Sequence, residues 1–166
     1  SDMLDDNYLS LAEIMRHQGF ATASFIQNGN GGPMAGLHQG FSNVFDVGTM
    51  GDRAERLYGK RLFEWIEKQS DRNIFIYLHL LDPHGAYDPP KPFDIWYRNA
   101  PPGSVPLEKD FRHDPDWVDT PTMEGRRLLY DGEILYNDFH FRRFLEKLGS
   151  NQLLNDTLMV MLADHG

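Results

Sequence analysis

Two nearly continuous apolar runs, each followed by an aspartate and a histidine, constrain the fold of this chain most strongly. The first covers residues 73–81 and leads into Asp82-Pro83-His84-Gly85; the second covers residues 156–163 and leads into Asp164-His165-Gly166. Neither run alternates polar with apolar residues, which is typical of strands covered on both faces of a parallel sheet. Because the carboxyl ends of parallel strands meet at one edge, the two Asp/His pairs are expected to open on the same edge.

The other segments predict helices around such a sheet. Ser10 and Glu13 have the S-x-x-E spacing of a capping box, which predicts a short helix that ends near Gly19. The apolar period over residues 52–69 predicts a second helix, and the period over 125–148 predicts a long one closed by Gly149.

A further strand and a long loop complete the organisation. Residues 21–26 are small, β-branched and apolar and lead into the glycine-rich segment 28–33, which predicts a buried strand that ends in a loop. Residues 86–124 have no sustained period and are expected to form a long loop excursion. Helices thus alternate with buried strands, so residues 1–166 are predicted to be a single partial α/β domain, a mainly parallel sheet flanked by helices.

Composition excludes several classes of protein. The chain has 25 acidic and 16 basic residues and a net charge of −9, without the basic stripe that is typical of nucleic-acid binders. No apolar run approaches the roughly 20 residues that a membrane-spanning helix requires. With no cysteine in the chain, disulfides and thiolate metal sites are excluded within it, while its localisation stays unknown.

Five segments, in order along the chain, resemble motifs of the sulfatases, a family of the alkaline phosphatase superfamily. They are residues 11–23, 36–46, 79–90, 130–138 and 157–166, the last being the hydrophobic run that ends in Asp-His-Gly. The resemblance implies a partial alkaline-phosphatase-like (sulfatase) domain. It further implies an enzyme that acts on small anionic esters.

The resemblance also implies roles for four residues. Asp164 and His165 match two ligands of a divalent cation, with Ca²⁺ expected first and Mn²⁺ as an alternative. His84 matches the residue that contacts the anion and protonates the leaving oxygen, a role that suits an imidazole near neutral pH. Asn28 lies where relatives place a polar contact to the anion, although the chain lacks their frequent G-K-W-H sequence.

The nucleophile of the family is missing from this chain. A formylglycine or hydroxyl in a C/S-x-P/A-x-R motif is expected upstream, and the S-x-P at Ser104 has Glu108 in place of arginine. Because the chain also stops directly after a predicted strand, we expect the central portion of a longer enzyme. Alone it is expected to be inactive, with an exposed sheet edge that favours oligomers.

The sequence therefore predicts the central portion of a metal-dependent sulfatase. Two alternatives remain within the superfamily: a phosphonate or phosphodiester hydrolase, and a phosphoethanolamine transferase. A third is a noncatalytic binding domain on a degenerate sulfatase scaffold. The substrate, the metal and the oligomeric state of the whole protein are not indicated.

Overall fold

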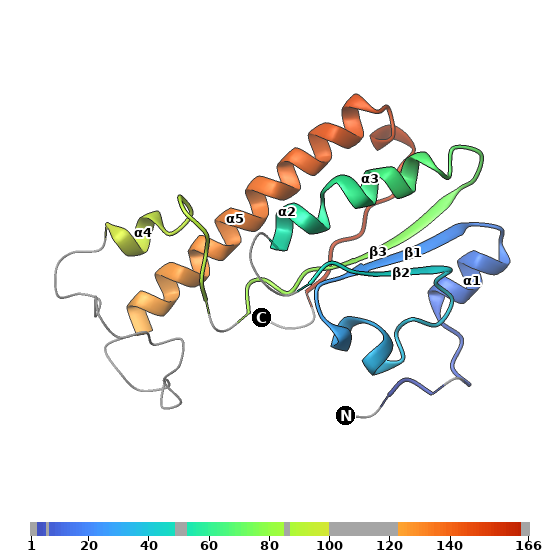
Figure 1. Ribbon diagram of the computed structural model, residues 1–166, viewed down its shortest axis with the longest axis horizontal. Helices are drawn as coiled ribbons and strands as arrows, with labels where there is room; N and C mark the ends of the chain where they lie inside the picture. The colour runs from blue at the N-terminus through green and yellow to red at the C-terminus, as the bar shows by residue number, and fades with distance from the viewer. Residues whose placement is uncertain (1–2, 6, 49–52, 85–86, 100–122, 164–166) are drawn as a thin grey trace.

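The computed structural model describes residues 3–5, 7–48, 53–84, 87–99 and 123–163 (Figure 1). Its strands are β1 (Ala21–Ile26), β2 (Asn43–Asp46) and β3 (Ile74–His79). Its α-helices are α1 (Leu11–His17), α2 (Arg53–Leu57), α3 (Lys60–Glu67), α4 (Ile95–Arg98) and α5 (Met123–Ser150). Short 3-10 turns are found at Gly29–Gly31, Pro33–Ala35 and Leu154–Asp156.

The three strands form one parallel sheet in the order β2-β1-β3. Ile26 of β1 is paired with Asp46 of β2 on one side and with His79 of β3 on the other. The predicted strand over 21–26 is therefore confirmed, and the run over 73–81 forms β3. The sequence pattern did not predict β2, because this short edge strand is largely exposed.

Helices cover the sheet and confirm the predicted α/β class. Figure 1 shows α2, α3 and α5 above the sheet and α1 below it. The core lies between β1 and the upper helices, where Phe25 is stacked on Phe45 and lies edge-on to Trp65. Phe144 of α5 and Phe63 of α3 continue this packing. Within the described residues, no helix combines the length and apolarity that crossing a membrane would take.

The predicted helix over 52–69 is instead two helices, which break at Tyr58 and Gly59. Gly59 is the N-cap of α3, and a Cβ at this position would lie 2.5 Å from the carbonyl oxygen of Glu55. The break therefore depends on close backbone approach at a glycine. The apolar period continues across it, which explains why periodicity alone predicted one helix.

The long helix α5 confirms the helix predicted over 125–148, but Gly149 does not end it. The helix continues to Ser150, and the left-handed residue is Gln152, with a φ of 59°. The N–H of Leu153 donates to the Leu148 carbonyl (2.9 Å), and the N–H of Gln152 donates to the Gly149 carbonyl (3.0 Å). These two bonds form a Schellman motif with glutamine where glycine is usual.

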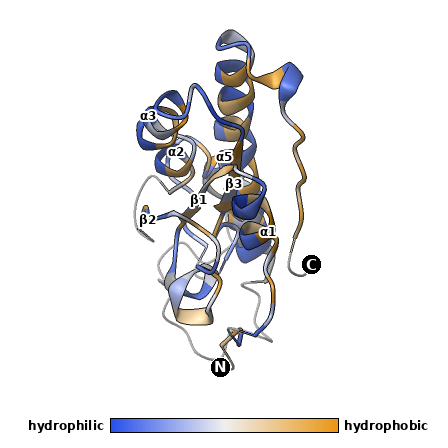
Figure 2. Cartoon of the chain, turned by 90° about the vertical axis from the view of Figure 1, so that its right-hand side faces the viewer, coloured by the Kyte–Doolittle hydropathy of each residue, from blue (hydrophilic) through white to orange (hydrophobic). Residues whose placement is uncertain are grey.

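The prediction of a strand over residues 157–163, parallel to the strand at 74–81, was wrong for the described structure. These residues form no ladder with any described strand, and Figure 2 shows them as an apolar segment that stands apart from the sheet. Leu158 is 91% exposed and Leu162 is 87% exposed. The apolar pattern predicted burial in a sheet, but a strand also needs backbone hydrogen bonds to a neighbouring strand, and in the described structure β3 makes its ladder with β1 and not with residues 157–163.

The predicted loop excursion over 86–124 contains one short helix, α4, in its described part. Asp164 and His165, the predicted metal ligands, lie outside the described residues, as do residues 100–122.

Candidate functional site

The carboxyl edge of the sheet carries the first part of the candidate site, at the end of β1. The strand is completely buried, and the polar residues Gln27 and Asn28 follow it directly. Gln27 is 0% exposed, whereas Asn28 is half-buried. The Oδ1 atom of Asn28 accepts a hydrogen bond from the N–H of Gly31 (3.1 Å), which leaves Nδ2 as the atom of this amide that can donate.

The glycine-rich segment after Asn28 packs tightly against the end of β3. A Cβ on Gly31 would lie 2.6 Å from the imidazole ring of His79. A side chain at Gly31 would therefore push the turn away from the strand. This close approach explains why glycine follows the buried strand here. The sequence pattern predicted only that these residues form a loop.

The end of β3 contributes the second part of the site. The chain continues past His79 to Asp82, whose side chain is buried (6% exposed), and then to His84, whose side chain is exposed. Since β1 and β3 are parallel and Ile26 is paired with His79, Asn28 and His84 both follow strand ends at the same edge. A solvent-accessible imidazole and a half-buried amide at such an edge can contact an anionic ligand.

Three buried or half-buried side chains hold the backbone around His84. The Oε1 atom of Gln27 accepts from the N–H of Leu81 (2.6 Å). Asn137 of α5 donates from Nδ2 to the carbonyl oxygen of Asp82 (3.0 Å). The sequence did not predict these contacts; the available signal was a polar residue, Gln27, directly after a strand predicted to be buried.

The third of these side chains is Glu133, which lies one turn before Asn137 on α5 and is 0% exposed. Its Oε1 atom accepts from the N–H of Asp88 (2.7 Å). A buried carboxylate usually has a specific hydrogen-bonding role, because burial without partners is costly. The residue was part of the motif at 130–138, but its spacing alone did not indicate what it contacts.

A metal site cannot be built from the described residues alone. No group of three or more His, Asp or Glu side chains among them is arranged to hold a metal ion. The predicted ligands, Asp164 and His165, lie outside the described residues, so the described part of the chain supplies no metal site by itself.

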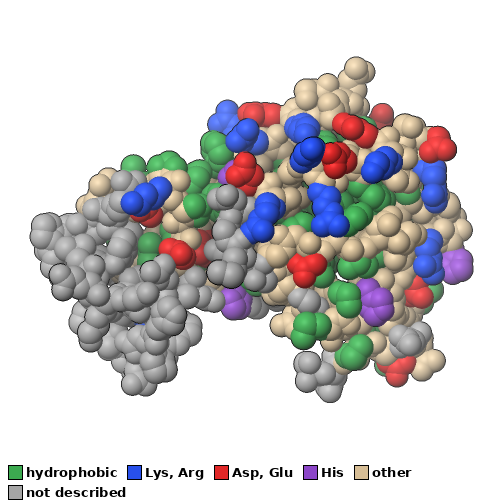
Figure 3. All heavy atoms as spheres, viewed as in Figure 1, with side chains coloured by type: hydrophobic (Ala, Val, Ile, Leu, Met, Phe, Trp, Pro, Cys, Tyr) green, Lys and Arg blue, Asp and Glu red, His purple; other side chains and the backbone are tan. Residues whose placement is uncertain are grey.

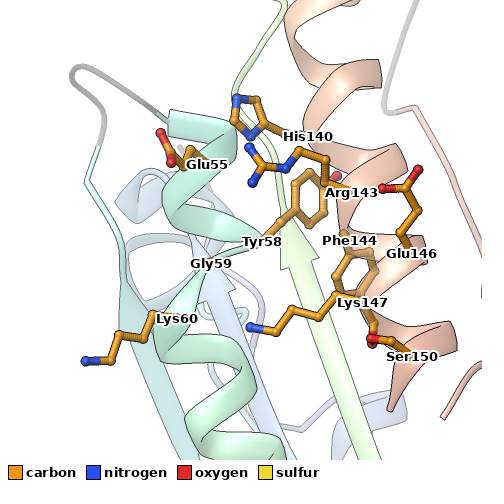
Figure 4. Close-up of a pocket in the computed structure, with 10 residues that line it drawn as sticks. All are labelled: Glu55, Tyr58, Gly59, Lys60, His140, Arg143, Phe144, Glu146, Lys147 and Ser150. Carbon is orange, nitrogen blue, oxygen red and sulfur yellow. The ribbon is translucent and has the colours of Figure 1, made fainter. Parts of the chain in front are cut away.

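A hollow of about 530 Å³ lies away from this edge, between the α2–α3 junction and α5 (Figure 4). The cations that line it have neighbours: Lys60 lies 3.4 Å from Glu64, and Lys147 lies 3.8 Å from the ring centre of Phe63. Burial raises the pKa of Tyr58 to about 12, so this phenol stays protonated at neutral pH. Basic and acidic side chains are interspersed over the helices (Figure 3), so this hollow has no single-sign charge and is not the candidate site.

Comparison with known proteins agrees with this architecture. The parallel sheet and its covering helices define an α/β domain. The model of the Sulfatase family matches residues 3–166, and the chain belongs to the sulfatase family. A search of curated proteins gave no match.

Two similar solved structures show the same fold. One is the crystal structure of the C-terminal periplasmic domain of EcEptC from Escherichia coli, with 17% identity and a TM-score of 0.58 over 86% of this chain. The other is that domain in complex with Zn, with 16% identity and a TM-score of 0.60, again over 86% of this chain. The chain spans 38% and 39% of the length of these two structures.

Proposed function

We propose that this chain is part of a metal-dependent enzyme that hydrolyses sulfate monoesters. The observation that supports this most is the placement of Asn28 and His84 at the same carboxyl edge, in a chain of the sulfatase family. A small anionic ester would lie over this edge. The whole enzyme would contain the segments that the chain lacks, including the nucleophile, for which the family resemblance implies formylglycine.

The two described residues have different roles in this proposal. The exposed imidazole of His84 donates a proton to the leaving oxygen of the ester, which lowers the cost of forming an alkoxide or phenoxide. The Nδ2 atom of Asn28 donates a hydrogen bond to an anionic oxygen, since Oδ1 already accepts from Gly31.

A divalent cation completes the proposed site, with Asp164 and His165 as two of its ligands. When bound, such a cation would stabilise negative charge on the ester. Carboxylate and imidazole ligands suit several cations; Ca²⁺ and Mn²⁺ are the expectation from the resemblance, and the zinc complex of the EcEptC domain adds Zn²⁺ to the candidates.

A second candidate function is a phosphoethanolamine transferase of the same superfamily, which the structural likeness to the EcEptC domain supports. The reactions differ in the group transferred and in its acceptor. Water accepts in a sulfatase, whereas an alcohol or amine accepts in a transferase.

The test is a substrate panel on the full-length protein that contains this chain, purified, stripped with chelator and then supplied separately with Ca²⁺, Mn²⁺ or Zn²⁺. Metal-dependent release of phenol from an aryl sulfate, with little release from the matched aryl phosphate diester, is the expected result. Preference for the phosphodiester would overturn the sulfatase proposal in favour of the related hydrolases. Transfer of phosphoethanolamine from a phosphatidylethanolamine donor, without sulfate release, would establish the second candidate. No turnover of any of these substrates by the metal-loaded protein would support a noncatalytic domain.

A further inference from the structure

We propose that Gln27, Glu133 and Asn137 are positioning residues that fix His84 over the sheet edge by holding the backbone on both sides of it. This inference rests on the proposed function, because it assigns a purpose to these bonds only if His84 acts on the substrate. We call the three side chains and the backbone groups that they bind, on Leu81, Asp82 and Asp88, the His84 clamp.

The first part of the His84 clamp extends the sheet beyond its last backbone pair. The β1–β3 ladder ends where Ile26 is paired with His79. Beyond this pair, the Oε1 atom of Gln27 accepts a hydrogen bond from the N–H of Leu81 (2.6 Å). Because Gln27 is 0% exposed, water does not compete for this bond. The path of the chain toward His84 is thus attached to β1, the central strand.

The second part comes from a single turn of α5. Glu133 and Asn137 are four residues apart and therefore lie on the same face of the helix. One accepts from the N–H of Asp88 at 2.7 Å, and the other donates to the carbonyl of Asp82 at 3.0 Å. The helix therefore binds backbone groups on both sides of His84. The Asn137 amide donates to the carbonyl before it, and the Glu133 carboxylate accepts from the N–H after it.

The placement of these bonds separates the His84 clamp from ordinary packing. They bind backbone groups, they flank a single exposed histidine, and they come from two separate parts of the fold, the end of β1 and helix α5. A general acid needs this kind of support, because a misplacement of about 1 Å can cost on the order of 100-fold in rate. An exposed side chain on an unsupported segment would not keep such a position.

The test measures the full-length enzyme with Glu133→Ala, Asn137→Ala and Gln27→Leu. Glu133→Gln is the conservative variant, because a glutamine Oε1 can still accept from the N–H of Asp88. Arg142→Ala is the matched control on the same helix, since this exposed residue pairs only with Glu146 among the described residues. Rates are measured on aryl sulfates, or on the aryl phosphodiesters if the panel above selects them, across leaving groups of increasing pKa.

We expect kcat to fall about 10- to 100-fold in the Ala and Leu variants, with KM within about threefold of the wild type. The loss should be largest for leaving groups of high pKa, because a nitrophenolate departs without a proton and a simple phenolate does not. Glu133→Gln should recover most of the rate, and Arg142→Ala should match the wild type. Amide hydrogen exchange at Leu81 should quicken in Gln27→Leu, and at Asp88 in Glu133→Ala.

Three results would overturn the proposal. Equal losses for all leaving groups would mean that the three residues act only on stability. If amide exchange at Leu81 and Asp88 is unchanged in Gln27→Leu and Glu133→Ala while His84→Ala is still impaired, the His84 clamp is rejected and the proposed function stands. Wild-type rates in His84→Ala would overturn the role of His84 and, with it, the positioning role.

Discussion

At the scale of single residues, the candidate site combines an exposed histidine with buried side chains that hold its backbone. His84 can meet a substrate because its side chain is exposed, while Gln27 and Glu133 are 0% exposed. Reactivity and support thus belong to different residues. Substitutions at the two kinds of position should therefore be distinguishable by experiment.

The first prediction separates the metal ligand from the general acid. In the full-length enzyme, Asp164→Ala should abolish turnover and lower the bound metal, because a ligand is lost. His84→Ala should lower kcat by about 10²- to 10⁴-fold and leave the metal content unchanged, since a general acid contributes to rate and not to metal affinity. Metal analysis beside kinetics checks both. Full activity in Asp164→Ala would reject the ligand assignment, and metal loss in His84→Ala would make that histidine a ligand.

The second prediction concerns the capping box of α1. The Ser10 Oγ atom accepts from the N–H of Glu13 (3.1 Å), and the Glu13 carboxylate accepts from the N–H of Ser10 (2.8 Å). The backbone N–H of Ser10, and after it the Ser10 hydroxyl, stabilise the ionised Glu13 carboxylate and hold its pKa below the usual 4.5. Ser10→Ala should cost about 1 kcal/mol of unfolding free energy.

The capping box also predicts a pH dependence with a definite sign. Because the folded pKa of Glu13 is depressed, its stabilisation is fully present above pH 4.5 and is lost as the pH falls through the lowered folded value. Glu13→Gln should therefore destabilise at pH 7 and match the wild type at pH 2, measured by urea unfolding. The exposed Glu67→Gln serves as control, and an equal deficit at both pH values would contradict the assignment.

At the scale of elements, the end of α5 gives the third prediction. Gln152 adopts a φ of 59° in the Schellman motif, a conformation that costs a non-glycine residue roughly 1–2 kcal/mol. Gln152→Gly should therefore raise the free energy of unfolding by about 1 kcal/mol, measured in urea. Asn151→Gly, one residue earlier and without a positive φ, should bring no gain. Equal effects of the two substitutions would show that the left-handed conformation is not the cause.

The elements also show how far the sequence predicted the fold. Apolar runs and the capping box predicted β1, β3, α1 and α5, because each follows a local pattern of burial or capping. The break at Gly59 and the unpaired segment at 157–163 were not predicted. The first depends on a contact with the Glu55 carbonyl, and the second depends on long-range strand pairing, which an apolar run does not specify.

The candidate site was predictable to a similar degree. His84 was singled out because it follows an apolar strand and matches a family motif, and Asn28 because it lies where relatives place a polar contact; in the structure both follow strands that end at one edge. Their roles remain predictions. Gln27 and Glu133 were missed as contacts because they bind backbone 54 and 45 positions away, and no local pattern specifies such a partner.

At the scale of the whole molecule, the fourth prediction is that the 166-residue chain alone is inactive toward aryl sulfates. It carries the edge with Asn28 and His84, but it contains no C/S-x-P/A-x-R motif for the nucleophile. Positioning without a nucleophile should give little turnover. Metal-dependent sulfate release that copurifies with the chain through several columns would show that it contains a nucleophile after all.

The fifth prediction is that this chain self-associates through residues 158–162. Leu158, Val160 and Leu162 are between 70% and 91% exposed, and exposed extended apolar segments recruit other chains. Leu158→Asp with Val160→Asp should shift the chain toward monomer in light scattering across a concentration series. Asn151→Asp with Asn155→Asp adds the same charge nearby and should change little. If both pairs of substitutions shift the chain toward monomer equally, the effect is due to net charge and not to the apolar segment.

The central position of β1 has a consequence for how the molecule loses its structure. A strand that is paired on both sides and fully buried belongs to the part of a protein that opens last, whereas a helix that closes one face can detach earlier in a sub-global opening. In mild denaturant, the ends of β1 and β3 should therefore stay joined through Gln27 after α5 has released Asp82 and Asp88. In such a partly open state the amide of Asn28 keeps its position, whereas His84 no longer has a fixed one. As denaturant is raised, turnover should therefore be lost before the affinity for an anion.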